Sequence, residues 1–237
     1  MKSLGGCVAI ITGASKGIGR AVALALSKQG VSVVLAARNS ELLAVLEQEI
    51  ISDGGTAVSI PTDVTSEHSI EHLIRETRKR FGKIDILINN AGVGIFSNVT
   101  DMTTEAFDEM MNVNVKGVFM CSRAVLPTMK AQQHGEIINV ASLAGKNSLA
   151  GGSVYSATKW GLIGFSRSLM LEVREYNIRV VTIAPGSVNT GFGEKERNEP
   201  MIIQPEDVAE TVIFALSMPG RVNVSEIDIR PTIKPRN

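Results

Sequence analysis

Short apolar runs alternate along the chain with longer segments of mixed polarity. The runs predict strands near residues 7–12, 31–37, 56–60, 84–89, 134–140, 178–184 and 224–229. The intervals carry apolar residues at helical spacing, as at Val22, Leu24 and Leu26 in the first one. Such alternation predicts parallel strands joined by right-handed crossovers, with helices on both faces of the sheet. The nearly continuous apolar run at 31–36 is typical of a strand covered on both faces.

A glycine-rich segment, Thr12 to Gly19, lies between the first strand and the first helix. The start of a helix exposes unpaired N–H groups and the positive end of its dipole, and glycines allow a pyrophosphate to approach closely. The spacing therefore predicts a phosphate-binding loop. The alternative is that Gly13, Gly17 and Gly19 only form a tight turn and permit close packing of helix on strand.

A candidate acid–base group follows in the second half of the chain. Tyr155 and Lys159 are four residues apart, which places them on one helix face, and Ser142 ends the apolar run 137–141. A free tyrosine has a pKa of about 10, and a neighbouring ammonium is expected to favour its phenolate. The alternative for Tyr155 is an amphipathic helix residue whose hydroxyl lies at the surface.

Six motifs, taken in order, resemble the short-chain dehydrogenase/reductase family over nearly the whole chain, from Lys2 to about Ile229. They are the segment 12–19, Asn89-Asn90-Ala91-Gly92, Asn114 within 113–117, Ser142, Tyr155 to Lys159, and Pro185-Gly186 followed by Thr190. The resemblance implies an α/β fold with a single Rossmann-type, doubly wound parallel sheet of seven strands in the order 3-2-1-4-5-6-7. In such a sheet the ligand binds at the carboxyl edge, where the strand order reverses.

The resemblance also implies roles for individual residues. Tyr155 protonates a ketone oxygen, Ser142 stabilises the charge that develops there, Lys159 binds the nicotinamide ribose, and Asn114 holds a water that links Lys159 to solvent. The catalytic set is therefore Asn114, Ser142, Tyr155 and Lys159. The cofactor-binding residues are expected at Gly13, Ser15, Lys16, Gly17, Ile18, Gly19, Arg38, Asp63, Val64, Asn90, Ala91, Gly92, Tyr155, Lys159, Pro185, Gly186, Val188 and Thr190.

The end of the second strand bears on the choice of cofactor. An acidic residue there binds a ribose 2′-hydroxyl, whereas a 2′-phosphate needs positive charge. Here the strand ends in Arg38, and Lys16 supplies a second cation, which together favour NADP(H) over NAD(H). Either residue alone could be a solvated surface charge. Asp63 and Val64 match the family's adenine-contacting pair, although Asp63 could instead cap a helix.

Composition excludes other classes of function. The 237 residues have a formal net charge of +0, which provides no electrostatic basis for binding nucleic acid or an anionic membrane. The absence of linker composition favours one domain over residues 1–237, and Cys7 and Cys121 are interpreted as core thiols of a cytoplasmic protein. His68 and His72 are assigned to a solvated helix face, with no metal expected.

Two long helices and one loop complete the picture. A helix beginning near Thr104 is expected to kink at Pro127. The helix from about Ser153 to Glu175 is apolar on most sides and needs two partners, one of which, by resemblance, is a second subunit. We therefore expect a homodimer or homotetramer. A short substrate lid is expected at about 190–204.

The sequence thus predicts an NADPH-dependent reductase of a ketone, with a 3-oxoacyl thioester or similar 3-oxo compound favoured because the chain most resembles 3-oxoacyl-acyl-carrier-protein reductases. A dehydrogenase of small 3-hydroxy acids, a general carbonyl reductase and a non-catalytic cofactor sensor are the alternatives; a pure scaffold is disfavoured by the intact glycine loop. A basic rim for an acidic carrier protein is not found, since Gln132 to His134 and Glu172 to Tyr176 are mixed in charge. An acyl carrier partner is therefore doubtful.

Overall fold

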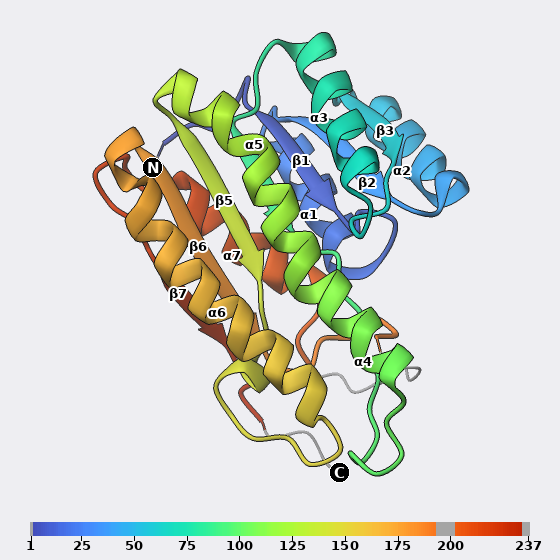
Figure 1. Ribbon diagram of the computed structural model, residues 1–237. Coiled ribbons are helices and arrows are strands. Elements are labelled where there is room, and N and C mark those ends of the chain that lie inside the picture. Colours follow the sequence, from blue (N-terminus) through green and yellow to red (C-terminus); the bar gives the residue numbers. More distant parts are fainter. Residues whose placement is uncertain (1, 193–201, 234–237) are drawn as a thin grey trace.

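A computed structural model describes residues 2–192 and 202–233 of the chain. Seven parallel strands form one sheet in the order β3-β2-β1-β4-β5-β6-β7, as the resemblance implied (Figure 1). The strands are β1 (Val8–Thr12), β2 (Ser32–Ala37), β3 (Ala57–Pro61), β4 (Ile86–Asn89), β5 (Gly135–Val140), β6 (Ile178–Pro185) and β7 (Glu226–Ile229). Each lies within two residues of its predicted bounds.

Helices cover both faces of this sheet. Their bounds are α1 (Gly17–Lys28), α2 (Ser40–Ser52), α3 (Glu67–Phe81), α4 (Thr104–Met111), α5 (Val118–Gln132), α6 (Ser153–Val173) and α7 (Pro205–Ser217). Helices α1, α2 and α7 pack on one face, and α3, α5 and α6 on the other. Figure 1 shows α5 and α6 in front of the strands and α7 behind them.

Alternate residues of each strand belong to the two opposite faces of the sheet. Ala9 and Ile11 of β1 belong to the core under α1 and α7, whereas Val8 and Ile10 belong to the core under α3, α5 and α6. Successive side chains of a strand point to opposite faces, so a strand apolar at every position can supply both cores. This explains why the strand pattern was readable from sequence.

The expected long helix from Thr104 with a kink at Pro127 is not one regular helix. It consists of α4, a π-helical turn over Asn112–Gly117, and α5, which contains Pro127. A π turn adds a residue to the helical circuit and is common at functional positions. Here the turn carries Asn114. Helix α6 ends at Val173 and continues as a single 3₁₀ turn over Arg174–Tyr176.

Both cysteines are free thiols, and burial raises the pKa of Cys121 to about 12, in keeping with a core residue. Within the described part of the chain, no helix combines the length and apolarity needed to cross a membrane.

Candidate active site

The glycine-rich loop connects β1 to α1 at the carboxyl edge of the sheet. Gly13 and Gly17 adopt positive φ angles of 66° and 55°, a conformation that L side chains rarely adopt. At Gly19 a Cβ atom would lie 2.3 Å from the Gly13 carbonyl oxygen, so no other residue fits there. The glycines therefore do form a tight turn and allow close packing of α1. These roles are compatible with phosphate binding, because they bring the start of α1 to the edge of the sheet.

The start of α1 has the character of an anion site. Lys16 occupies the N-cap position without a side-chain cap, and the first turn holds no acidic residue. The N–H groups of this turn and the helix dipole favour a negative group. Thr190, in the loop after β6, lies beside Gly17, where a Cβ would stand 3.1 Å from its side chain. This cradle of small residues fits the pyrophosphate of a dinucleotide.

The loop after β4 is fastened to the loop after β1. The N–H groups of Asn90 and Ala91 both donate to Thr12 Oγ1 at 3.1 Å, and Asn90 Nδ2 donates to the carbonyls of Thr12 and Gly13, also at 3.1 Å. These hydrogen bonds join the ends of two adjacent strands across the sheet edge. They hold the segment that begins at Asn90 next to the glycine loop.

The charged residues expected near the adenosine ribose follow three neighbouring strands, with Lys16 after β1, Arg38 after β2 and Asp63 after β3. Arg38 and Lys16 are exposed, and neither has an ion-pair partner in the described ranges. The carboxylate of Asp63 accepts hydrogen bonds from the N–H of Thr65 at 2.9 Å and its hydroxyl at 2.8 Å. These bonds, together with the nearby charge of Arg38, hold the pKa of Asp63 below its usual value despite partial burial. Ser66, not Asp63, caps α3, which removes the capping interpretation of Asp63.

Ser142 and Tyr155 meet at the carboxyl edge of β5. Ser142 follows β5 and α6 begins two residues before Tyr155, so a short connection brings both hydroxyls together. Burial raises the pKa of Tyr155, and the hydrogen bond between its hydroxyl and Ser142 lowers it by a smaller amount. Ser142 Oγ also accepts from the Ala144 N–H at 3.1 Å, which fixes the serine in place.

Lys159 lies one helical turn after Tyr155 and is buried, with 5% of its surface exposed. Its Nζ donates to the Val140 carbonyl at 3.0 Å and stands 5.7 Å from the centre of the Tyr155 ring. Burial lowers the pKa of Lys159 to about 8. The net shift of the Tyr155 pKa is upward because burial of the phenol outweighs the hydrogen bond with Ser142.

Asn114 is fully buried in the π turn, and its side chain is held by three hydrogen bonds. Oδ1 accepts from the Val93 N–H at 2.9 Å, and Nδ2 donates to the Val93 carbonyl at 2.8 Å and to Thr158 Oγ1 at 3.1 Å. Both amide hydrogens are therefore used within the protein. Asn114 ties the loop after β4 to α6, the helix that carries Tyr155 and Lys159.

A second buried chain of polar side chains was not anticipated from the sequence. Asn89 Nδ2 donates to Ser122 Oγ at 3.1 Å and to Asn139 Oδ1 at 2.9 Å, and Asn139 Nδ2 donates to Ser166 Oγ at 2.8 Å. The chain joins β4 and β5 to α5 and α6. A buried network with fixed partners holds α6 at one register relative to the sheet. The only sequence signal is that these four polar residues lie within otherwise apolar elements.

The remaining predicted residues fall at the same edge or outside the described chain. Pro185 ends β6, the Gly186 N–H donates to the Ile229 carbonyl at 2.9 Å, and Val188 forms a bridge with Ile203. Ser15 and Ile18 belong to the glycine loop and helix start, and Val64 follows Asp63 after β3. Of the expected lid at 190–204, residues 193–201 lie outside the part that the structure describes.

Two aromatic residues flank the candidate acid: Phe96, which was not anticipated from the sequence, and Phe192, which lies within the expected lid. The ring centres of Phe96 and Phe192 lie 5.3 Å and 5.9 Å from that of Tyr155. Phe96 belongs to the loop after β4 and Phe192 to the loop after β6. Both loops follow strands at the carboxyl edge, which is the signal that could have identified them.

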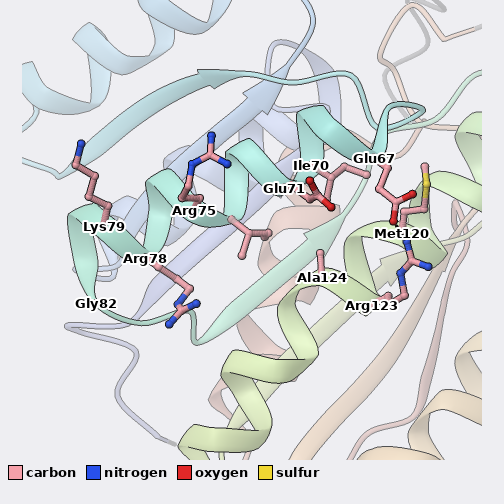
Figure 2. Close-up of a pocket in the computed structure, with 11 residues that line it drawn as sticks. Glu67, Ile70, Glu71, Arg75, Arg78, Lys79, Gly82, Met120, Arg123 and Ala124 are labelled. Carbon is pink, nitrogen blue, oxygen red and sulfur yellow. Dashed lines mark hydrogen bonds and ion pairs between the residues drawn. The ribbon is translucent and has the colours of Figure 1, made fainter.

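A cavity of about 610 Å³ lies elsewhere, between α3 and α5. Figure 2 shows Glu67 and Glu71 towards one end of α3 and Arg78 and Lys79 towards the other, with Met120, Arg123 and Ala124 on α5. None of the predicted catalytic or cofactor-binding residues lines it. His72 contacts Arg75, and no cluster of possible metal ligands occurs among the residues described.

The sequence of the chain is similar to those of known proteins. The family described as short chain dehydrogenase matches residues 7–200. An uncharacterized oxidoreductase of Staphylococcus aureus (strain USA300) is 38% identical over 228 residues, covering 94% of this chain and 96% of its own.

Two solved structures have the same architecture. An alcohol dehydrogenase from the archaeon Thermococcus sibiricus, complexed with 5-hydroxy-NADP, is 31% identical with a TM-score of 0.91, covering 98% of this chain and 99% of its own. A metagenomic short-chain oxidoreductase in complex with NADP is 39% identical with a TM-score of 0.88, covering 98% of this chain and 100% of its own.

Proposed function

The chain belongs to the short-chain dehydrogenase family and is an oxidoreductase, and we propose that it works as a single cofactor-binding domain that reduces a ketone with NADPH. The observation that carries the proposal is that Lys159 Nζ lies 5.7 Å from the centre of the Tyr155 ring and donates to the Val140 carbonyl, next to Ser142, at the sheet edge where the glycine loop opens. An acid, a hydrogen-bonding hydroxyl and a dinucleotide cradle in one place are what reduction of a carbonyl requires.

The residues divide the work as follows. Tyr155 donates its proton to the substrate oxygen while Ser142 donates a hydrogen bond to the same oxygen and stabilises the negative charge that develops. The raised pKa of Tyr155 keeps the phenol protonated at neutral pH, which suits the direction of reduction. When bound, the reduced nicotinamide supplies the hydride to the carbonyl carbon. Lys159 holds the nicotinamide ribose and faces the phenol.

Asn114 is proposed as a positioning residue. Its side chain grips both backbone groups of Val93 and the hydroxyl of Thr158, so it sets the spacing between the loop after β4 and the helix of Tyr155. Both of its amide hydrogens are taken, so the water that we propose to link Lys159 to solvent would be held by the oxygen atoms of Asn114.

Preference for NADP(H) rests on Arg38 and Lys16. Arg38 is exposed directly after β2, where a 2′-phosphate would lie, and its planar guanidinium can bind that phosphate with two hydrogen bonds. Lys16 is exposed in the glycine loop, at the N-cap of α1. The NADP complexes of the two similar structures support this choice. For the substrate we propose a 3-oxoacyl thioester or a similar 3-oxo compound; the other candidates are a small 3-hydroxy acid and a simple ketone.

A second copy of the chain is the proposed partner. Trp160 and Leu171 on α6 are 55% and 58% exposed, and Phe119 on α5 is 43% exposed. Between them Gly161 and Gly164 leave open space where a Cβ would stand. Such exposed apolar side chains support packing of α5 and α6 against the same helices of another subunit.

Replacement of Tyr155 by Phe tests the proposed mechanism. It removes the proton donor but keeps the ring, so kcat should fall by about a hundredfold or more while NADPH affinity stays within about twofold. Turnover is measured by NADPH oxidation with a panel of 3-oxo esters, and affinity by fluorescence titration. Phe214→Ala, a change on the exposed surface of α7, is the control. Turnover by Tyr155→Phe equal to that of the wild type would remove Tyr155 from the mechanism.

A further inference from the structure

Three aromatic rings from three separate segments meet beside the candidate acid. The Phe96 ring is tilted by 60° to that of Tyr155, and the Phe192 ring by 54°. Their centre-to-centre distances of 5.3 Å and 5.9 Å are those of favourable tilted aromatic pairs. The two phenylalanines therefore form apolar walls against the side chain that is proposed to protonate the substrate.

Neither phenylalanine belongs to the core of the protein. Phe96 is 46% exposed and Phe192 is 43% exposed, and both lie outside the three buried clusters that join helices to sheet. Fold stability alone gives no reason to place two half-exposed rings on the loops that end β4 and β6. An apolar surface that is half open to solvent beside a reactive group is typical of a binding site.

The local backbone is adapted to these rings. A Cβ at Gly94 would lie 2.5 Å from the Phe192 ring and 3.1 Å from the Phe96 ring, so the absence of a side chain there makes room for both. The adjacent Val93 is fixed by Asn114, and the Phe192 N–H donates to Thr190 Oγ1 at 3.3 Å. Both walls are thus anchored to segments that the proposed cofactor site also uses.

The charges near these walls do not suit an anionic substituent. Among the described residues, no lysine or arginine stacks on Phe96 or Phe192. Lys159 lies over Tyr155 and donates to a backbone carbonyl. Lys146, which follows Ser142 in the chain, is paired with Glu226 at 2.8 Å and with Asp228 at 2.6 Å.

We infer that Phe96 and Phe192 form an aromatic subsite that selects ketones bearing an aryl group on the carbonyl carbon. This inference rests on the proposed function, because a carbonyl oxygen held by Tyr155 and Ser142 places one of its substituents against these rings. A flat aryl group can pack at a tilt against both rings, whereas a methyl group offers little surface for such packing. Within the proposed 3-oxo class, the substrate therefore carries an aryl group at the 3-position.

A matched pair of substrates tests the subsite. Ethyl 3-oxo-3-phenylpropanoate and ethyl 3-oxobutanoate differ only in phenyl against methyl on the reacting carbon. With NADPH and the wild-type chain, kcat/KM should favour the phenyl compound by about tenfold or more. Phe96→Ala and Phe192→Ala should each reduce that preference by about fivefold or more, mainly through the phenyl compound. Phe214→Ala removes a ring that is 48% exposed on α7 and should leave the preference unchanged.

Phe192→Leu separates an aromatic from a merely apolar wall. It keeps an apolar side chain of similar volume, so the preference for phenyl should fall part of the way towards that of Phe192→Ala. A wild-type enzyme that reduces the methyl compound as well as the phenyl compound would overturn the inference while leaving ketone reduction intact. If the ratio of kcat/KM for the phenyl compound to that for the methyl compound is unchanged in both Phe96→Ala and Phe192→Ala, the inference is likewise overturned.

Failure of ketone reduction itself is recognised separately. If neither ester nor any simple ketone is reduced, the proposed function fails, and the subsite is then tested by binding alone. Saturation-transfer NMR with acetophenone should show transfer to its aryl protons in the wild type and in Phe214→Ala, and loss of that transfer in Phe96→Ala and Phe192→Ala. Absence of transfer in the wild type, or equal transfer in all four proteins, would refute the subsite.

Discussion

Lys159→Met tests the energetic consequence of the ammonium buried in the proposed site. Lys159 is 5% exposed, donates to the Val140 carbonyl at 3.0 Å, and has no carboxylate partner among the described residues. Burial lowers its pKa from 10.5 to about 8. The folded chain therefore binds fewer protons than the unfolded chain between these two pH values, and this residue's contribution to stability rises with pH across the window. Below about pH 8 the buried ammonium stays charged, and its full destabilising effect on the folded chain is present.

The size of the effect follows from the change in pKa. At about 1.4 kcal/mol for each pH unit, the change from 10.5 to about 8 corresponds to about 3 kcal/mol. The methionine variant has no ammonium, so the difference in unfolding free energy between the two proteins should change by about 3 kcal/mol from pH ~7 to pH ~10.5, with the variant relatively more stable at pH ~7. Loss of the hydrogen bond to Val140 costs about 1–3 kcal/mol at both pH values and cancels in this comparison.

The assay is urea unfolding followed by circular dichroism at a fixed protein concentration. Both proteins carry Tyr155→Phe, so that titration of the neighbouring phenol does not contribute. Lys116→Met in the same background is the control for loss of one exposed lysine. If the stabilities of the protein that retains Lys159 and of the Lys159→Met variant change in parallel with pH, the reasoning from burial is refuted.

Three further predictions concern ligands and assembly. Arg38→Asp should weaken NADPH binding by about tenfold to a hundredfold in fluorescence titrations and raise the relative use of NADH, since one charge-assisted contact is worth about 1.5–3 kcal/mol; retained affinity would point to Lys16. A 3-oxoacyl pantetheine thioester should be reduced with a kcat/KM within about tenfold of that for the same acyl group on a carrier protein, with little dependence on salt, and a larger carrier preference that fades with salt would contradict this. Leu171→Glu should shift the sedimenting species of the wild-type dimer or tetramer to a smaller mass, and an unchanged mass would exclude this face as the contact.

The fold corrects the location assumed for the carrier-binding rim, because the residues of mixed charge at 132–134 and 172–176 lie away from the candidate site and do not bear on carrier binding beside it. Gln132 ends α5 and Glu172 lies near the end of α6, so both precede the strands β5 and β6. They are therefore at the amino edge of the sheet, opposite to Ser142 and Tyr155, as Figure 1 allows the reader to follow. Lys130, near that edge, stacks on the Tyr176 ring with its Nζ 4.3 Å from the ring centre. A carrier docked there could not deliver its acyl group to Tyr155 of the same subunit.

The sequence determined the strands, the glycine loop and the order of the motifs. Each strand is apolar at nearly every position because it is buried on both faces. This pattern can be recognised in the sequence of the strand itself, without knowing which elements pack against it. The glycines at 13, 17 and 19 were equally readable because their positive φ angles or close contacts exclude other residues. The resemblance added the strand order, which the hydrogen-bonded register confirms.

Only the tertiary structure decided how the side chains of the site interact. The pKa of Tyr155 is raised chiefly by burial, which depends on what the rest of the chain packs around the phenol. The partners of Asn114, the π turn that carries it, and the approach of Phe96 and Phe192 to Tyr155 all depend on contacts between segments far apart in the chain. Spacing within one element fixes which residues share a face, whereas desolvation and ring packing depend on what the rest of the chain brings to that face.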